Sequence, residues 1–105
     1  MKRPTRSAIL NWTLDKLARE AGKRGYPLAR LFFLALKSRL RNYPGAYQRE
    51  SWEPVNIRLR TVLCYPAKIH KRNLSGIGDK EIRSTRAFIK SLDPTLDFIP
   101  DKPIF

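Results

Sequence analysis

The chain has 105 residues, enough for one domain, and carries 22 Lys and Arg against 9 Asp and Glu, a formal net charge of +13. Positive charge of this size opposes compaction unless an anionic partner neutralises it. The hydrophobic share of 42% excludes a wholly disordered tail. The single Cys64 excludes an internal disulfide framework and favours a reducing compartment. The longest apolar run, 31–36, is too short to span a membrane, which needs about 20 residues.

The first predicted element is a helix over about residues 8–21, with Ser7 as its N-cap and Gly22 as its C-terminal stop. Its apolar residues recur at helical spacing and predict one buried stripe, formed by Leu10, Leu14, Leu17 and Ala21.

A second helix is predicted over about residues 27–42, because Pro27 fits the first turn of a helix without losing a hydrogen bond. The short loop before Pro27 predicts an antiparallel helical hairpin. The apolar centre, 31–36, predicts burial on more than one face.

The period then changes to that of a strand, over about residues 55–65. Apolar Val55, Ile57 and Leu59 alternate with polar residues, which include Arg58 and Arg60. This alternation predicts one short, half-buried strand with a basic outer face.

Two further helical segments are predicted after the strand. Pro66 opens a short helical turn that ends near Asn73, and Asp79 caps a last helix over about residues 80–92. Asp93 and Pro94 end that helix.

The segment 93–105 differs from the rest in charge and composition. Residues 1–92 hold 21 basic and 6 acidic residues, or +15, whereas residues 93–105 hold one basic and three acidic residues, or −2. Three prolines in 93–105 predict an extended tail. We expect the tail to dock on a neighbouring protein through Phe98, Ile99, Ile104 and Phe105. The alternative, in which the tail folds back onto its own domain, stays open.

The predicted fold is therefore mainly α, with an N-terminal helical hairpin, one short strand, a C-terminal helix and a proline-containing tail. Residues 1–92 form a single small basic domain, and residues 93–105 form the tail.

Few residues suit catalysis or metal binding. His70 is the single histidine and lies among cations, so we expect it to contact phosphate or solvent. Cys64, at strand spacing, is expected to be a small buried hydrophobe. A metal site needs three or four ligands, and Cys64 with His70 supplies two. The sequence therefore predicts no enzyme, cofactor, metal or small-molecule substrate.

The segment 74–78 reads Leu-Ser-Gly-Ile-Gly and precedes the last predicted helix. This Gly-hydrophobic-Gly turn resembles the hairpin of helix-hairpin-helix nucleic-acid-binding motifs. The resemblance implies that Gly76 and Gly78 let the backbone approach a phosphate, with Lys80 and Arg83 adding charge. Ser75 and Ile82 depart from the motif, and Asp79 would compete with the phosphate.

Basic residues are spread over nearly every predicted element, and between residues 21 and 78 the only acids are Glu50 and Glu53. Surfaces that are merely solvated mix both signs, so this distribution predicts a polyanion-binding surface. Its predicted residues are Lys2, Arg3, Arg6, Lys16, Arg19, Lys23, Arg24, Arg39, Arg41, Arg58, Arg60, Lys68, Lys71, Arg72, Gly76, Gly78, Lys80 and Arg83. Aromatic residues such as Trp12 and Tyr26 interleave the cations and are expected to pack in the core, with base stacking left open.

These features predict an RNA-binding structural subunit of a ribonucleoprotein, in contact with rRNA and neighbouring subunits. The first candidate for the assembly is an organellar (mitochondrial) ribosome. The acid-free, basic residues 1–14 resemble an organellar targeting segment, with the cytoplasm as the other compartment. Two alternatives stay open: a peripheral accessory subunit of an organellar respiratory complex, and a small non-specific DNA-binding protein.

Overall fold

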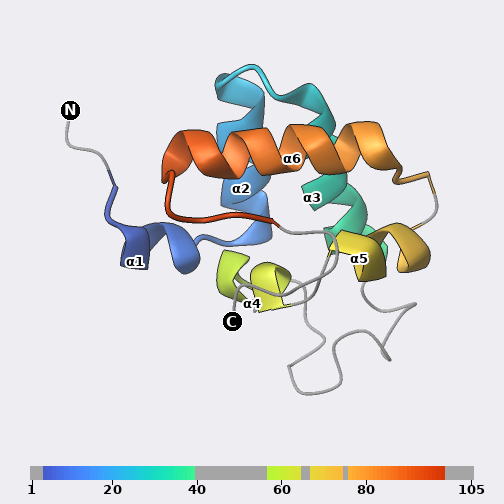
Figure 1. The fold of residues 1–105 in the computed structure, drawn as a ribbon, viewed down its shortest axis with the longest axis horizontal. Helices are drawn as coiled ribbons and strands as arrows, with labels where there is room; N and C mark the ends of the chain where they lie inside the picture. Colours follow the sequence, from blue (N-terminus) through green and yellow to red (C-terminus); the bar gives the residue numbers. More distant parts are fainter. Residues whose placement is uncertain (1–3, 40–56, 65–66, 75, 99–105) are drawn as a thin grey trace.

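The computed structural model describes residues 4–39, 57–64, 67–74 and 76–98, and this part of the chain is mainly helical, as predicted (Figure 1). The helices are α1 (Arg6–Leu10), α2 (Leu14–Lys23), α3 (Pro27–Arg39), α4 (Leu59–Cys64), α5 (Ala67–Asn73) and α6 (Asp79–Leu92).

The predicted continuous helix over 8–21 is wrong, because the chain breaks at residues 11–13 into α1 and α2. Each short helix has its own threonine cap. The hydroxyl oxygen of Thr5 accepts from the backbone N–H of Ala8, and that of Thr13 accepts from the N–H of Lys16, both at 3.1 Å. Threonine satisfies N–H groups that have no partner within a helix, so Thr13 starts a new helix in the middle of the apolar stripe.

The join between α2 and α3 also differs in detail from the prediction. Helix α2 continues through Gly22 to Lys23, and the left-handed turn falls at Gly25, whose φ is +84°. The two helices pack against each other, and an ion pair of 2.6 Å between Asp15 and Lys37 joins the start of α2 to the end of α3. This contact brings the first turn of α2 close to the last turn of α3.

The predicted strand is wrong over its described residues, since Leu59–Cys64 forms helix α4. An isolated antiparallel bridge between Thr13 and Arg58 precedes α4. Leu59, Val62 and Leu63 are all buried, and their spacing of three and four residues fits a helix as well as the alternation fits a strand. Residues 55, 56 and 65 of the prediction lie outside the described residues.

Helix α5 agrees with the predicted helical turn, and α6 with the predicted last helix. Asp79, however, is the first residue of α6, and Gly78 is its N-cap. The carboxylate of Glu81 accepts the backbone N–H of Gly78 at 3.0 Å, as in a capping box. At the other end Asp93 leaves the helix in an extended conformation, as predicted.

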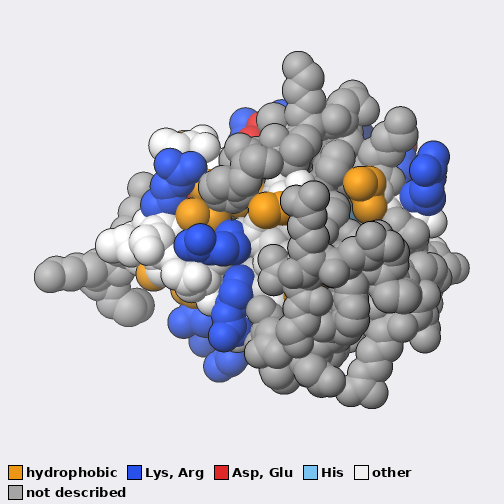
Figure 2. Space-filling model, turned by 90° about the horizontal axis from the view of Figure 1, so that it is seen from below, with side chains coloured by type: hydrophobic (Ala, Val, Ile, Leu, Met, Phe, Trp, Pro, Cys, Tyr) orange, Lys and Arg blue, Asp and Glu red, His pale blue; other side chains and the backbone are white. Residues whose placement is uncertain are grey.

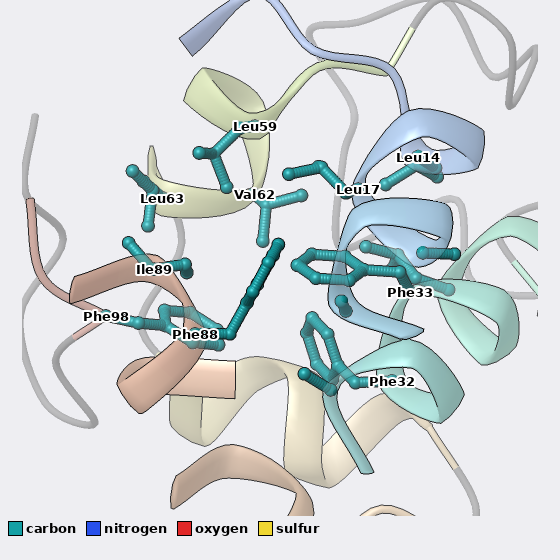
Figure 3. Close-up of a cluster of buried hydrophobic side chains, with 14 of the residues drawn as sticks. Leu14, Leu17, Phe32, Phe33, Leu59, Val62, Leu63, Phe88, Ile89 and Phe98 are labelled. Carbon is teal, nitrogen blue, oxygen red and sulfur yellow. The ribbon is translucent and has the colours of Figure 1, made fainter. Parts of the chain in front are cut away.

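The core lies where α2, α3, α4 and α6 meet (Figure 3). Leu14 and Leu17 of α2 point into it, as do the rings of Phe32 and Phe33 from α3. The apolar stripe of the first predicted helix is buried as expected; Leu10, Leu14, Leu17 and Ala21 are at most 8% exposed.

Residues 93–98 run back along α6 (Figure 1) and complete this core. Leu96 is fully buried, and Phe98, which is 1% exposed, packs its ring on Phe32 with 5.6 Å between centroids. Phe98 therefore belongs to the core of its own chain and does not offer a docking surface to a neighbour. The other predicted docking residues, Ile99, Ile104 and Phe105, lie outside the described residues.

Candidate polyanion-binding surface

Every acidic side chain in the described residues is held by an intramolecular contact. Asp15 pairs with Lys37, Glu20 lies 3.7 Å from Lys23 and 3.6 Å from Arg24, and Asp79 pairs with Lys71. Glu81 caps α6, Asp93 accepts two hydrogen bonds from Thr95, and Asp97 pairs with Arg86 and Lys90. The acids therefore neutralise only part of the positive charge.

A second group of cations forms no ion pair within the described residues, and all of its side chains are exposed. These residues are Arg6, Lys16, Arg19, Arg30, Arg60, Arg72, Lys80 and Arg83. They come from α1, α2, α3, α4, α5 and α6. The unneutralised charge is therefore distributed over the molecule.

Figure 2 shows the distribution on one face of the molecule. Lys and Arg side chains gather at the end where α1 and α4 lie, and a further group stands at the opposite edge, beside α5. Hardly any acidic side chain is visible among the coloured atoms of this face. A face of this kind attracts phosphate groups and repels other cations.

Helix α2 carries a line of three exposed cations. Lys16, Arg19 and Lys23 lie three and four residues apart on its exposed side, which places them along one face. The Lys16 ammonium stands 4.9 Å from the centre of the Trp12 ring, a cation–π contact. Trp12 itself is partly buried against the core, so it packs as expected of the aromatic residues.

Arg30 of α3, which is not among the cations predicted for the surface, also approaches α2. Its side chain lies across Gly22 of α2, where an added Cβ would stand 3.2 Å from the Arg30 Cδ. The glycine thus leaves room for an arginine from the next helix. The one signal for Arg30 in the sequence is its spacing of seven residues from Lys37, which does not reveal a contact with α2.

The cations at the end of α6 are arranged differently. Arg86 donates to both carboxylate oxygens of Asp97, at 2.7 and 3.0 Å, and Lys90 lies 3.6 Å from the same carboxylate. The hydrogen bond from Arg86 holds the pKa of the Asp97 carboxyl below its usual value. Residues 93–98 therefore neutralise this part of α6.

In the Gly76–Gly78 turn, the backbone N–H groups of Ile77 and Gly78 already have acceptors within the chain; that of Ile77 donates to the carbonyl oxygen of Leu74 at 3.2 Å. The N–H of Gly78 is taken by Glu81, and the Asp79 carboxylate is paired with Lys71, which lowers the pKa of that carboxyl. Gly76 has a φ of +86°, so a left-handed turn alone explains this glycine. We leave Gly76 and Gly78 out of the surface.

Two expectations about single residues are wrong. His70 is 1% exposed and lies between Phe32 and Phe98, with ring centroids 5.3 and 5.4 Å away, so it contacts neither phosphate nor solvent. Burial lowers the pKa of His70 from 6.5 to about 4. Cys64 is exposed rather than buried, because it stands at the end of a helix and not within a strand.

Several predicted residues lie outside what the structure describes. They are Lys2, Arg3 and Arg41, together with the side chains of Arg39 and Lys68. The described cations Lys23, Arg24 and Lys71 are paired with acids, and Arg58 takes part in the bridge to Thr13.

The described residues contain no group of three or more His, Cys, Asp or Glu that could hold a metal ion. Within the same residues, no helix has both the length and the apolar character needed to cross a membrane. Comparisons with protein-family models, curated proteins and solved structures give no match.

Proposed function

We propose that this chain is a non-catalytic RNA-binding structural subunit of a ribonucleoprotein, an organellar ribosome being the assembly that fits it best. It would contact the phosphate backbone of rRNA and neighbouring subunits. The observation that carries this proposal is the exposed, unpaired cations on all six described helices, beside acids that are all engaged.

The distribution of the cations supports RNA more than a flat anionic surface. A membrane surface or a straight duplex presents charge to one side of a protein, whereas folded rRNA surrounds its proteins. Exposed cations on all six described helices, some of them visible on the face in Figure 2, suit a protein embedded in RNA. Neutralising phosphates would also release condensed counterions, which favours binding.

The organellar part of the proposal rests on the sequence. Residues 1–14 hold three basic residues, Lys2, Arg3 and Arg6, and no acid. Segments of this composition occur in mitochondrial targeting peptides.

The salt dependence of RNA binding tests the proposal. The affinity of the full chain for a fragment of folded rRNA should fall by roughly a thousandfold or more between about 50 and 200 mM salt if several phosphates are contacted. The matched control is the chain with anionic lipid vesicles under the same conditions. A flat salt profile, or binding to the vesicles with none to RNA, would overturn the proposal.

A further inference from the structure

The contacts around α2 assign the RNA to one part of the basic surface. We propose that the exposed side of α2, together with Arg30 of α3, is the main contact of this chain with an RNA phosphate backbone. We call this set, formed by Lys16, Arg19, Lys23 and Arg30, the α2–α3 cationic face. The inference rests on the proposed function, because it names the place where the RNA binds.

The first argument is the rigid support under this face. The inner side of α2 is fully packed, with Leu14, Leu17, Ala18 and Ala21 all at most 4% exposed. Helix α3 packs along α2, and the Asp15–Lys37 ion pair ties their far ends together. Side chains on the outer side of α2 therefore project from a fixed backbone, which lowers the entropy lost on binding.

The second argument is the positioning of Lys16. Its ammonium stands 4.9 Å from the centre of the Trp12 ring, and Trp12 packs against the core. The contact holds a flexible side chain near one place while its charge stays exposed. A lysine held in this way meets a phosphate with less loss of rotamer freedom than a free one.

The third argument is the approach of Arg30 to α2. Glycine is a poor residue inside a helix, yet α2 has Gly22 where Arg30 crosses it. The contact brings the Arg30 side chain against Gly22, which follows Arg19 by three residues and directly precedes Lys23 on α2. Arginine binds phosphate through two parallel hydrogen bonds. Arg30 would therefore add a positive charge and a directional, bidentate contact to those of the cations on α2.

The fourth argument is the weak neutralisation of this face. Helix α2 has two acids, and both are engaged: Glu20 is shared between Lys23 and Arg24 at 3.7 and 3.6 Å, and Asp15 pairs with Lys37. Lys16, Arg19 and Arg30 have no acidic partner in the described residues, whereas Asp97 engages both Arg86 and Lys90 on α6. Like charges spaced three and four residues apart repel each other, and phosphates between them would remove that repulsion.

The test compares two variants with the same change in net charge. One is the triple substitution Lys16→Gln, Arg19→Gln and Arg30→Gln; the control is Arg60→Gln, Arg72→Gln and Arg83→Gln, on α4, α5 and α6. The dissociation constant for a fragment of folded rRNA is measured over a range of salt concentrations. Thermal melting followed by circular dichroism checks that both variants keep the fold.

The α2–α3 triple should lower RNA affinity by about tenfold or more and reduce the salt slope by about two to three, because each lost phosphate contact removes about one. The control triple should change affinity much less. Equal losses would overturn the assignment to α2–α3 while leaving the proposed function intact. If neither triple weakens binding, both proposals are overturned.

A single substitution tests the same face without changing charge. Gly22→Ala would place a Cβ 3.2 Å from the Arg30 Cδ, so the flexible Arg30 side chain should shift by a few tenths of an ångström. RNA affinity should therefore fall slightly, and less than in Arg30→Gln, although alanine favours the helix. Loss of affinity without loss of melting temperature supports the positioning of Arg30 by Gly22. Unchanged affinity in Gly22→Ala, together with unchanged affinity in Arg30→Gln, removes Arg30 from the face.

Discussion

The imidazole of His70 packs against the phenyl ring of Phe98, with 5.4 Å between the ring centroids and 60° between the planes. The His70 ring also makes a 3.2 Å contact through Nε2 with the carbonyl oxygen of Val62. Because a carbonyl only accepts, Nε2 carries the proton in this contact. One histidine thus joins α4 and α5 to the segment that follows α6.

The burial of His70 predicts a loss of stability in mild acid. The pKa of His70 is lowered from 6.5 to about 4 in the folded state, so the unfolded chain binds the proton more tightly. The free energy of unfolding is therefore highest, as far as His70 is concerned, above pH 6.5, and it decreases as the pH falls toward 4. The loss amounts to roughly 3 kcal/mol in the free energy of unfolding.

Denaturant unfolding from neutral pH to about pH 4 measures this loss, and His70→Gln, which keeps a donor near Val62, is the control. The chain has one histidine, so its imidazole resonances in a nuclear magnetic resonance titration report His70 alone. A titration midpoint near 6.5 in the folded protein would contradict the burial of this ring.

The burial of Phe98 predicts that the end of the described chain is essential to the fold. Phe98→Ala should lower the free energy of unfolding by about 3–5 kcal/mol, since it leaves a cavity beside Phe32 and His70. It should also let water reach His70 and raise the pKa of that imidazole toward its ordinary value. Thermal and denaturant unfolding measure the first effect.

Leu31→Ala is the matched control for Phe98→Ala, because Leu31 is 51% exposed. Its effect should stay within about 0.5 kcal/mol. A stable Phe98→Ala protein that fails to join its assembly would instead make Phe98 a docking residue.

The contact of Asp97 with Arg86 and Lys90 predicts opposite effects on stability and on RNA binding. Asp97→Asn should destabilise the fold by about 1 kcal/mol or less, as is typical of exposed ion pairs. The same change releases two cations on α6 and should strengthen RNA binding at low salt. Asp15→Asn, which releases Lys37 alone, is the comparison; an unchanged or weaker affinity in Asp97→Asn would refute the screening by Asp97.

The turn before α6 predicts different responses from its two glycines. Gly76→Ala should destabilise the protein by about 1 kcal/mol, because its φ of +86° strains any residue with a Cβ. Gly78→Ala should be nearly neutral, since the new Cβ would stand 3.7 Å from Glu81 Oε1. Neither change should alter RNA affinity in the folded protein; a clear loss in Gly78→Ala would restore the turn to the binding surface.

The amino-acid sequence by itself determined the features that depend on composition and on neighbouring residues. The mainly helical fold, the buried stripe from Leu10 to Ala21 and the end of α6 at Asp93 follow from spacing and capping preferences. The large positive charge is also known from the composition alone. Such features are local, so a short window of sequence contains their cause.

Tertiary structure alone decided the features that depend on distant contacts. The alternation before Cys64 suits a strand or a helix, and burial of Leu59, Val62 and Leu63 against the core selects helix α4. A histidine among cations looks exposed in the sequence, but the rings of Phe32 and Phe98 enclose it.

The same holds for the candidate site. The sequence gives the number of cations but does not reveal which acids or helices each cation contacts. Asp97 reaches Arg86 eleven residues away, and Arg30 reaches Gly22 across two helices. Which charges are neutralised, and which remain for an RNA backbone, is decided when the helices pack, because ion pairs depend on distances in space rather than along the chain.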